Sequence, residues 1–330
     1  MKGGMSAFGG GGGILNIVKN KMGDKDPDEE RQLLPSWTAQ VDPDVSCTCC
    51  AFSPSADMLA VGDDMGAVSI VAPKTGEVTA RLGAVHNKQT TNMAMSLADN
   101  GRGTVMAVKF NPGASKKIIR IALSNGKVEQ WDASPGKNSC KSEDVREDGQ
   151  NKDRKGCQQA LALDYVHDGQ YFAVAGVDHK DGPGSQRHAV RVYDEATSKL
   201  TMTLIGDMND GHSNRVSCLR FDQKAKGRLA SGSMDGTVKL WSTGDRNPIA
   251  TLPGGEKDAK GQDPQGKFDP TSVDFVGGNY LLISSARPLK NLTLYDLRMA
   301  TQPVYVSDVR TGSREPAPDL PPKPRAVRTF

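Results

Sequence analysis

Residues 211–242 read GHSNRVSCLRFDQKAKGRLASGSMDGTVKLWS, and this stretch carries the strongest structural signal in the chain. Its segment 216–221, VSCLRF, mixes apolar and polar residues that favour strands, and glycine-rich and charged stretches bound it on either side. This pattern is typical of a strand. Two more strand-forming segments, 229–233 and 237–241, flank an Asp-Gly pair at 235–236. Such a pair favours a type I′ hairpin, in which both central residues have a positive φ. The stretch therefore predicts antiparallel strands joined by a hairpin of fixed register.

The same stretch resembles a WD repeat, the four-stranded unit of one class of β-propeller. The resemblance implies a hydrogen-bonded tetrad made by a His, a Ser of the second strand, the Asp of the turn and a Trp of the third strand. In this sequence those positions are His212, Ser231, Asp235 and Trp241. A hydrolase triad also uses Asp, His and Ser, but no G-x-S-x-G elbow surrounds Ser231. We therefore interpret the four residues as structural.

An aromatic residue at the end of the first strand recurs at intervals of 54–58 residues, at Phe52, Phe110, Tyr165, Phe221 and Phe275. These intervals exceed the ~40–45 residues of a compact WD blade, so each repeat carries extra residues in its connections. The predicted fold class is all-β, a WD-repeat β-propeller with five recognisable four-stranded blades. The repeats lie near residues 45–82, 104–135, 159–205, 211–252 and 270–306.

The repeats differ in how well the pattern is kept. Only the fourth has the whole tetrad, whereas the second has Ile121 for the Ser and Asn125 for the Asp. The sequence leaves two ways for the ring to close. Residues 37–41 suit an outer strand supplied by the N-terminal part, and residues 302–306 suit the same outer strand. Either five blades close the ring, or the chain forms part of a larger propeller completed by a partner or by residues beyond this sequence.

Three segments have few residues to bury. Residues 1–35 are glycine-rich and charged, and we expect a flexible N-terminal segment before a propeller at 36–309. Residues 137–156 hold six basic and five acidic side chains, which predicts a solvated loop between the second and third blades. Residues 310–330 form a Pro-rich basic tail, and their P-x-x-P-x-K pattern at 318–323 is of the kind that SH3 grooves accept. Patterns this short also arise by chance.

Charge and hydropathy limit the classes of partner. The 42 basic and 39 acidic residues give a net charge of +3 and are interleaved along the chain, so we expect no nucleic acid as a partner. No apolar run approaches ~18 residues, and the N-terminus lacks the apolar core of a secretory signal. We expect no membrane association and an intracellular location, with the cytoplasm favoured and the nucleus left open.

The chain has six cysteines, and three of them cluster at Cys47, Cys49 and Cys50. In a strand the first two point to one face and the third to the other, which suits a tetrahedral metal site poorly. No second C-x-x-C or H-x-H pattern exists to complete such a site. We therefore expect no metal and no cofactor, and we interpret Cys49 as a small core residue.

These observations predict a non-enzymatic scaffold for protein–protein interactions, a docking platform within a larger intracellular assembly. An enzyme is disfavoured because no nucleophile, base and oxyanion hole are placed together. The expected partner-binding residues lie beside the tetrad and at equivalent places in other repeats: Arg215, Met234, Asp64 and Ser124.

An alternative function rests on a short motif in the fifth repeat. The segment LYDLR at 294–298 resembles the W-D-x-R box by which some WD-repeat proteins serve as substrate receptors of cullin-type ubiquitin ligases. Docking would then run through Tyr295 to Arg298. The simpler interpretation, which we favour, is that Tyr295 and Asp296 end a third strand and that Arg298 begins the next turn.

Overall fold

The computed structural model describes residues 14–18, 35–40, 44–83, 103–114, 117–134, 140–144, 159–179, 186–206, 210–253, 269–286, 292–299 and 303–307. Within these ranges every element of regular secondary structure is a β-strand. The chain divides into two compact units, Met1–Asp144 and Val145–Phe330.

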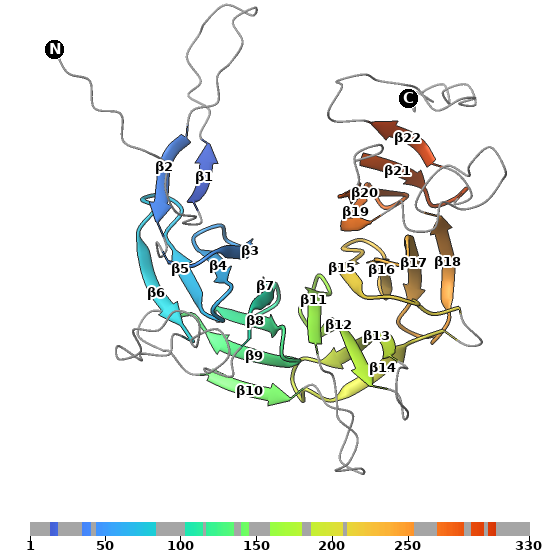
Figure 1. Ribbon diagram of the computed structural model, residues 1–330, viewed down its shortest axis with the longest axis horizontal. Helices are drawn as coiled ribbons and strands as arrows, with labels where there is room; N and C mark the ends of the chain where they lie inside the picture. Colours follow the sequence, from blue (N-terminus) through green and yellow to red (C-terminus); the bar gives the residue numbers. More distant parts are fainter. Residues whose placement is uncertain are drawn as a thin grey trace, which may run out of the picture. The chain divides into compact units, whose positions relative to one another are not determined.

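The first unit contains two four-stranded antiparallel sheets and one separate pair of strands (Figure 1). The first sheet consists of β3 (Cys47–Phe52), β4 (Leu59–Asp63), β5 (Val68–Val71) and β6 (Val78–Leu82). The second consists of β7 (Val105–Phe110), β8 (Ile118–Leu123), β9 (Lys127–Asp132) and β10 (Cys140–Asp144). The separate pair joins β1 (Ile14–Val18) to β2 (Pro35–Gln40).

The second unit contains three four-stranded antiparallel sheets, corresponding to the third, fourth and fifth repeats. The third-repeat sheet has β11 (Gln159–Tyr165), β12 (Tyr171–His179), β13 (Gln186–Asp194) and β14 (Leu200–Leu204). The fourth has β15 (Val216–Phe221), β16 (Arg228–Ser233), β17 (Thr237–Ser242) and β18 (Pro248–Pro253). The fifth has β19 (Pro270–Val276), β20 (Tyr280–Ser285), β21 (Leu292–Asp296) and β22 (Pro303–Ser307).

All five sheets have the same topology, in which strands that are neighbours in the chain are neighbours in the sheet. Short connections between antiparallel strands produce this order, as in a propeller blade. The predicted all-β fold with five four-stranded blades is therefore confirmed.

The hairpin between β16 and β17 has a different turn from the one predicted. Its loop spans residues 234–236, and the Gly236 N–H donates to the Ser233 carbonyl at 3.1 Å. Gly236 has a φ of 87°, whereas Asp235 does not have a positive φ. The type I′ prediction is therefore wrong. A three-residue loop needs a left-handed backbone at only one position, and here a glycine supplies it.

Each first strand has a β-bulge near its start, where the register with the second strand shifts. In two blades the bulged residue carries a hydroxyl that reaches the next blade of the same unit. Thr48 Oγ1 donates to the Val105 carbonyl at 2.5 Å, and Ser217 Oγ donates to the Pro270 carbonyl. Bulges re-aim side chains, and here they tie first strands of adjacent blades together.

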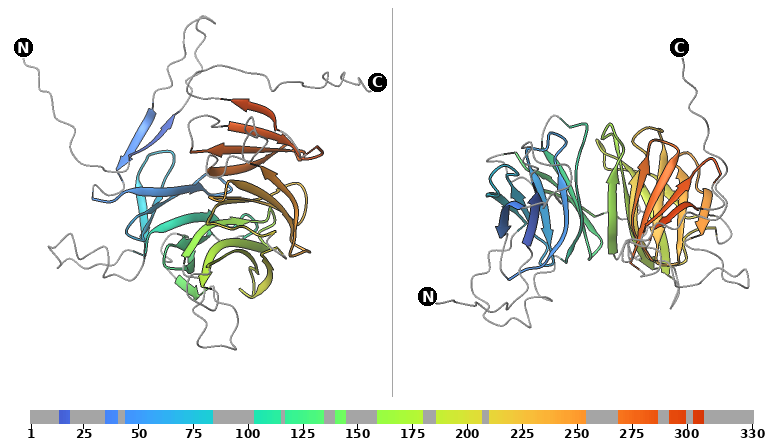
Figure 2. Two further views of the ribbon diagram at one scale, coloured as in Figure 1. Left: turned by 45° about the vertical axis from the view of Figure 1, so that its right-hand side comes forward. Right: turned by 90° about the horizontal axis from the view of Figure 1, so that it is seen from above.

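Adjacent blades within a unit pack face to face around apolar side chains. One core cluster joins the two blades of the first unit, and in the second unit one cluster joins the third and fourth blades and another the fourth and fifth. Figure 2 shows the sheets of each unit next to one another. The close approach needs a glycine in the second strand: a Cβ on Gly232 would lie 2.6 Å from Cys218 Sγ and 2.7 Å from Pro270 Cβ. The core therefore lies between sheets, and the sheet ends are left to carry function.

Two segments differ from the sequence-based expectations, and a third agrees with one of them. The region 1–35, expected to be flexible, contains β1, which pairs with β2. The expected solvated loop at 137–156 contains β10, the outer strand of the second blade. The fifth blade has β22 as its own outer strand, as residues 302–306 suggested. Outer strands are held by the backbone ladder, so polar sequences such as CKSED can form them without an apolar face.

Candidate functional site

Each blade has two ends, which differ in what they carry. At the end that holds the tetrad in the fourth blade, the first strand begins and the second strand turns into the third; we call this the tetrad end. At the opposite end, the first strand turns into the second and the third into the fourth. Of the residues predicted to bind partners, four lie at tetrad ends and Arg298 lies at an opposite end.

Hydrogen bonds join the four residues of the tetrad in the fourth blade. His212 Nδ1 lies 2.9 Å from Asp235 Oδ2, and His212 Nε2 lies 2.7 Å from Ser231 Oγ. The indole N–H of Trp241 donates to Ser231 Oγ at 2.7 Å. Because this oxygen accepts from Trp241, its own hydrogen is free to point to His212 Nε2, which leaves the ring proton on Nδ1 for the carboxylate. Ser231 is fully buried, so it has no access to a substrate.

The charges of this network follow from burial. Burial would raise the pKa of Asp235, but hydrogen bonds from His212, Thr237 and the Ser213 N–H outweigh it and hold that pKa well below its ordinary value. Burial also lowers the pKa of His212, despite the opposing effect of Asp235. His188 forms an isolated β-bridge with His212, and burial, followed by His212 itself, lowers its pKa too. At neutral pH both histidines are therefore uncharged beside an ionised carboxylate.

This arrangement makes the stability of the chain dependent on pH. We expect the free energy of unfolding to be largest above a pH of about 6.5 and to fall as the pH drops below it. In that range the histidines become protonated in the unfolded state but stay neutral where they are buried in the folded state. The slope is at most about 1.4 kcal/mol per pH unit for each histidine. Urea unfolding followed by circular dichroism at pH values between about 7.5 and 5.5 measures it.

Two variants test the origin of this slope. His212→Gln and His188→Gln should each reduce it, because each removes one buried histidine whose pKa is lowered. Stability that rises on acidification would contradict the assignment of neutral histidines.

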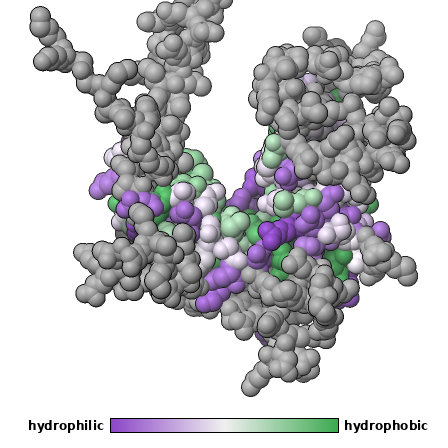
Figure 3. All heavy atoms as spheres, in the orientation of Figure 1, coloured by the Kyte–Doolittle hydropathy of each residue, from purple (hydrophilic) through white to green (hydrophobic). Residues whose placement is uncertain are grey.

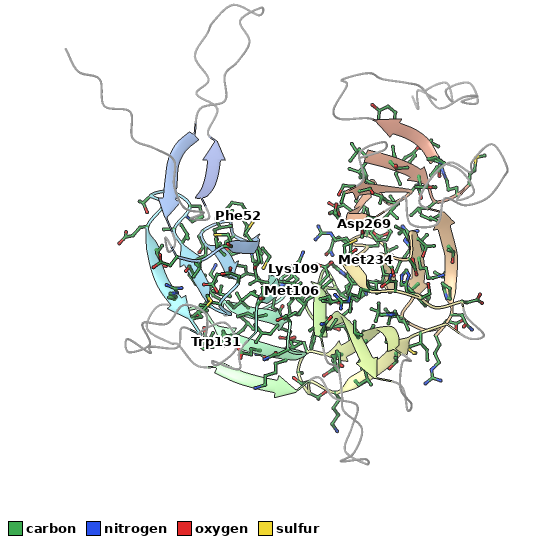
Figure 4. The ribbon with its side chains drawn as sticks, in the orientation of Figure 1. Phe52, Met106, Lys109, Trp131, Met234 and Asp269 are labelled. Carbon is green, nitrogen blue, oxygen red and sulfur yellow. The ribbon has the colours of Figure 1, made fainter. Side chains whose placement is uncertain are left out.

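The second blade satisfies its tryptophan differently. There Ile121 replaces the serine, and the Trp131 indole N–H donates instead to Glu129 Oε2 at 2.9 Å; Trp131 is labelled in Figure 4. Glu129 lies two residues before the tryptophan, so both side chains are on one face of β9. Sequence comparison with the fourth repeat alone does not find this residue. The available signal is a carboxylate two positions before Trp131 in a strand that is otherwise buried.

Arg215 and Met234 lie together at the tetrad end of the fourth blade. The Met234 N–H donates to the Arg215 carbonyl at 2.9 Å, which holds the two residues side by side. Both are exposed, Met234 to 47%. A cation next to an exposed apolar side chain can bind an apolar segment that carries negative charge.

Asp64 and Ser124 occupy the equivalent position in the first unit, but their side chains are engaged locally. The Ser46 N–H donates to Asp64 Oδ1 at 3.0 Å, and the Thr104 N–H donates to Ser124 Oγ at 2.9 Å. Thr104 Oγ1 in turn donates to the Asp64 carbonyl at 3.1 Å and links the two blades. These two residues thus cap the starts of first strands, which leaves them little capacity for a partner.

Arg298 does not lie near the other predicted residues of the second unit. Its guanidinium donates to both carboxylate oxygens of Asp296 and lies over the Tyr280 ring, with Cζ 5.7 Å from the centroid. Tyr295 is fully buried. The segment proposed to dock on a ubiquitin ligase is thus the end of β21, where Tyr295 is enclosed in the core, followed by a turn in which Arg298 is ion-paired with Asp296.

A chain of charges across the first strands of the second unit was missed by the sequence reading. Arg220 Nε donates to Asp274 Oδ1 at 2.9 Å, and Arg220 Nη1 lies 3.6 Å from Asp164 Oδ1. Each residue directly precedes the aromatic residue that ends the repeat's first strand. In the first unit the same position holds Ala51 in the first repeat and Lys109, labelled in Figure 4, in the second. Alignment of the second to fifth repeats therefore shows alternating charge there.

No group of three or more His, Cys, Asp or Glu residues suited to a metal ion occurs in the part of the chain that the structure describes. Cys49 packs against the core of the first unit, and burial raises the pKa of its thiol to about 11. The described ranges also include no helix that is long and apolar enough to cross a membrane. On the face drawn in Figure 3, hydrophilic residues cover much of the described surface, with smaller hydrophobic areas between them.

The chain is similar both to a protein family and to individual proteins. The family model for the "WD domain, G-beta repeat" matches residues 200–242, which run from β14 through β17. The sequence repeat thus begins one strand before the blade, with the outer strand of the preceding sheet. The "U3 snoRNP-associated protein-like EMB2271" of Arabidopsis thaliana is 27% identical over 222 residues, which are 67% of this chain and 38% of that protein. The chain thus matches less than half the length of this relative.

Proposed function

Because this chain is a WD-repeat protein, we propose that it is a non-enzymatic scaffold that binds other proteins within a larger assembly. The observation that carries the proposal is the state of the tetrad: the only clustered Ser, His and Asp of the best-preserved repeat are buried and bonded to one another. Arg215 and Met234, directly beside them, are exposed and free to contact a partner. The side chains that could take part in catalysis are therefore inaccessible, whereas the residues that we propose to contact a partner lie at the surface.

The assembly that we propose is a ribonucleoprotein particle. The relative from Arabidopsis has the name of a U3 snoRNP-associated protein-like protein, and this supports a nuclear location for the present chain rather than the cytoplasm favoured from the sequence. The small net charge of +3 suits contact with the protein components of such a particle more than with its RNA. A ubiquitin-ligase role has no comparable support, since Arg298 is paired with Asp296.

Affinity purification from the cells that express the chain tests this proposal. We expect the tagged full-length protein to recover U3 RNA at least about tenfold above an unrelated small RNA, together with a fixed set of proteins. The proteins should remain bound after ribonuclease treatment, because the contacts are between proteins. A combined Arg215→Glu and Met234→Asp variant should lose both.

Lys74→Glu is the matched control, since Lys74 is exposed in the first unit and lies at the opposite end of its blade. It should recover as much RNA and protein as the unchanged chain. Sedimentation of the tagged chain as a free monomer, without enriched RNA or proteins, would refute the scaffold proposal.

A further inference from the structure

Exposed apolar side chains gather at the opposite ends of the blades, away from the tetrad. Among the described residues, eight large apolar side chains are exposed, and six lie within two residues of an opposite end. The six are Phe52, Val78, Tyr171, Ile249, Val276 and Met299. Three of these belong to the fourth and fifth blades, and their exposed fractions are larger than that of Tyr171 in the third blade. They are Ile249 at 62%, Val276 at 44% and Met299 at 66%.

The turns that carry these three residues form one continuous surface. In the fourth blade the Thr243 N–H donates to the Gly227 carbonyl at 2.7 Å, which joins its two opposite-end turns. In the fifth blade the Leu297 N–H does the same to the Asn279 carbonyl at 2.7 Å. Arg228 connects the two blades, because its guanidinium donates to the Gly278 carbonyl. Its Cζ also lies 5.3 Å from the centroid of the Phe275 ring.

This surface has unpaired positive charge. Lys224, Lys226 and Arg246 are exposed in the fourth-blade turns, and none of them forms an ion pair with another described residue. A Cβ on Gly278 would lie 3.8 Å from Lys224 Cδ, so this lysine borders the fifth blade. The same turns hold three carboxylates. Asp245 is exposed and accepts the Asn247 N–H at 3.1 Å, so it offsets part of the positive charge, whereas the other two are already neutralised. Asp222 is held by Arg228, and Asp296 is held by Arg298.

The surface has a clear boundary on the side of the third blade. The opposite end of that blade holds three acidic residues, Asp168, Asp194 and Glu195, against one lysine, Lys199. Gln223 Nε2 donates to the Tyr165 carbonyl at 3.2 Å, so the acidic end adjoins the fourth blade directly. The basic and apolar surface lies on the fourth and fifth blades, and we call it the basic edge: Lys224, Lys226, Arg246, Ile249, Val276 and Met299. Arg246 lies at its border with the third blade, where the Arg246 carbonyl accepts the Gly206 N–H at 3.1 Å.

We propose that the basic edge docks a segment of a partner protein in which acidic residues alternate with apolar ones. Three unpaired cations beside three exposed aliphatic side chains complement such a segment in both charge and hydropathy. RNA fits less well, since single strands are bound by stacking bases on aromatic rings, and Arg298 already covers the Tyr280 ring at this edge. The inference rests on the proposed scaffold function and adds a second contact surface to it.

A peptide selection on the full-length chain tests the proposal. Phage displaying random twelve-residue peptides are selected, and enriched peptides are labelled with fluorescein and titrated by fluorescence polarisation. We expect the enriched peptides to combine Asp or Glu with Leu, Ile or Phe. Their Kd should rise at least about tenfold for Lys224→Glu/Lys226→Glu and for Met299→Ser. Peptides in which the acids are replaced by lysine should bind the charge-reversed chain and not the original.

Three controls make the outcome decisive. Lys199→Glu makes half of the same charge change on the acidic third blade and should leave the Kd unchanged. The combined Arg215→Glu and Met234→Asp variant distinguishes the two surfaces. If acidic peptides lose binding only in this variant, they bind beside the tetrad; this result would overturn the proposed basic edge and leave the scaffold function standing. A mixed-sequence RNA of twenty nucleotides that binds and is lost in Lys224→Glu/Lys226→Glu, without acidic peptides, would replace a protein partner with RNA. Enrichment of no acidic peptide would also overturn the proposal.

Discussion

Trp241→Ala is expected to lower the free energy of unfolding by about 3–5 kcal/mol, the range for removing a large aromatic side chain from a core. Trp241 is 1% exposed and belongs to the cluster that joins the third and fourth blades. Its loss leaves a cavity between two sheets and removes the donor to Ser231 Oγ in the buried tetrad. Urea unfolding followed by circular dichroism or intrinsic fluorescence measures the change.

Trp241→Phe separates the two contributions. Phenylalanine fills most of the space but has no N–H, so we expect a loss of about 1–3 kcal/mol from the unsatisfied tetrad and the smaller ring. Trp241→Ala must therefore be clearly the more destabilising. If the two variants lose equal stability, packing between the blades is not the main role of this residue.

Asp164→Ala is expected to cost about 2 kcal/mol, because it removes the acceptor of a buried backbone N–H. Asp164 is 3% exposed, and its Oδ2 accepts the Phe221 N–H of the next blade at 2.8 Å. Its other oxygen faces Arg220 at 3.6 Å, and that arginine is partly exposed, so the ion pair itself adds less than the hydrogen bond. The same urea titration measures this change.

Two further variants locate the cause. Asp164→Asn keeps an acceptor for the Phe221 N–H and should lose less than Asp164→Ala. Asp274→Ala removes the exposed partner of Arg220 and should cost less than about 1 kcal/mol. A larger loss in Asp274→Ala than in Asp164→Ala would show that the surface ion pair, not the buried contact between blades, holds the first strands together.

Much of the fold could be predicted because its signals are local. The glycine at 236, the strand-forming segments around it and the recurring aromatic residue each act within one hairpin or one strand. The prediction failed for the turn type and for β10, since the turn depends on the loop length that the sheet register selects. The polar strand β10 pairs with β9 through the backbone, and such pairing does not require an apolar pattern in the sequence.

The candidate site was less predictable. Repeat equivalence placed Arg215, Met234, Asp64 and Ser124 at the same end of their blades, yet the last two are occupied by capping the strands beside them. Equivalence in sequence does not fix whether a polar side chain is free, because that depends on which backbone N–H groups surround it. Glu129, which replaces the tetrad serine as the acceptor of an indole N–H, was missed for the same reason.

The sequence by itself determined that this chain builds five four-stranded blades, because strand period, turn residues and repeat spacing are written in neighbouring residues. Only the tertiary structure decided which charged and apolar side chains remain available. Asp222 and Asp296 are neutralised by arginines of their own blades, while Lys224 and Lys226 form no ion pair among the described residues. That difference arises from the packing of one sheet end against the next, which no single stretch of sequence contains.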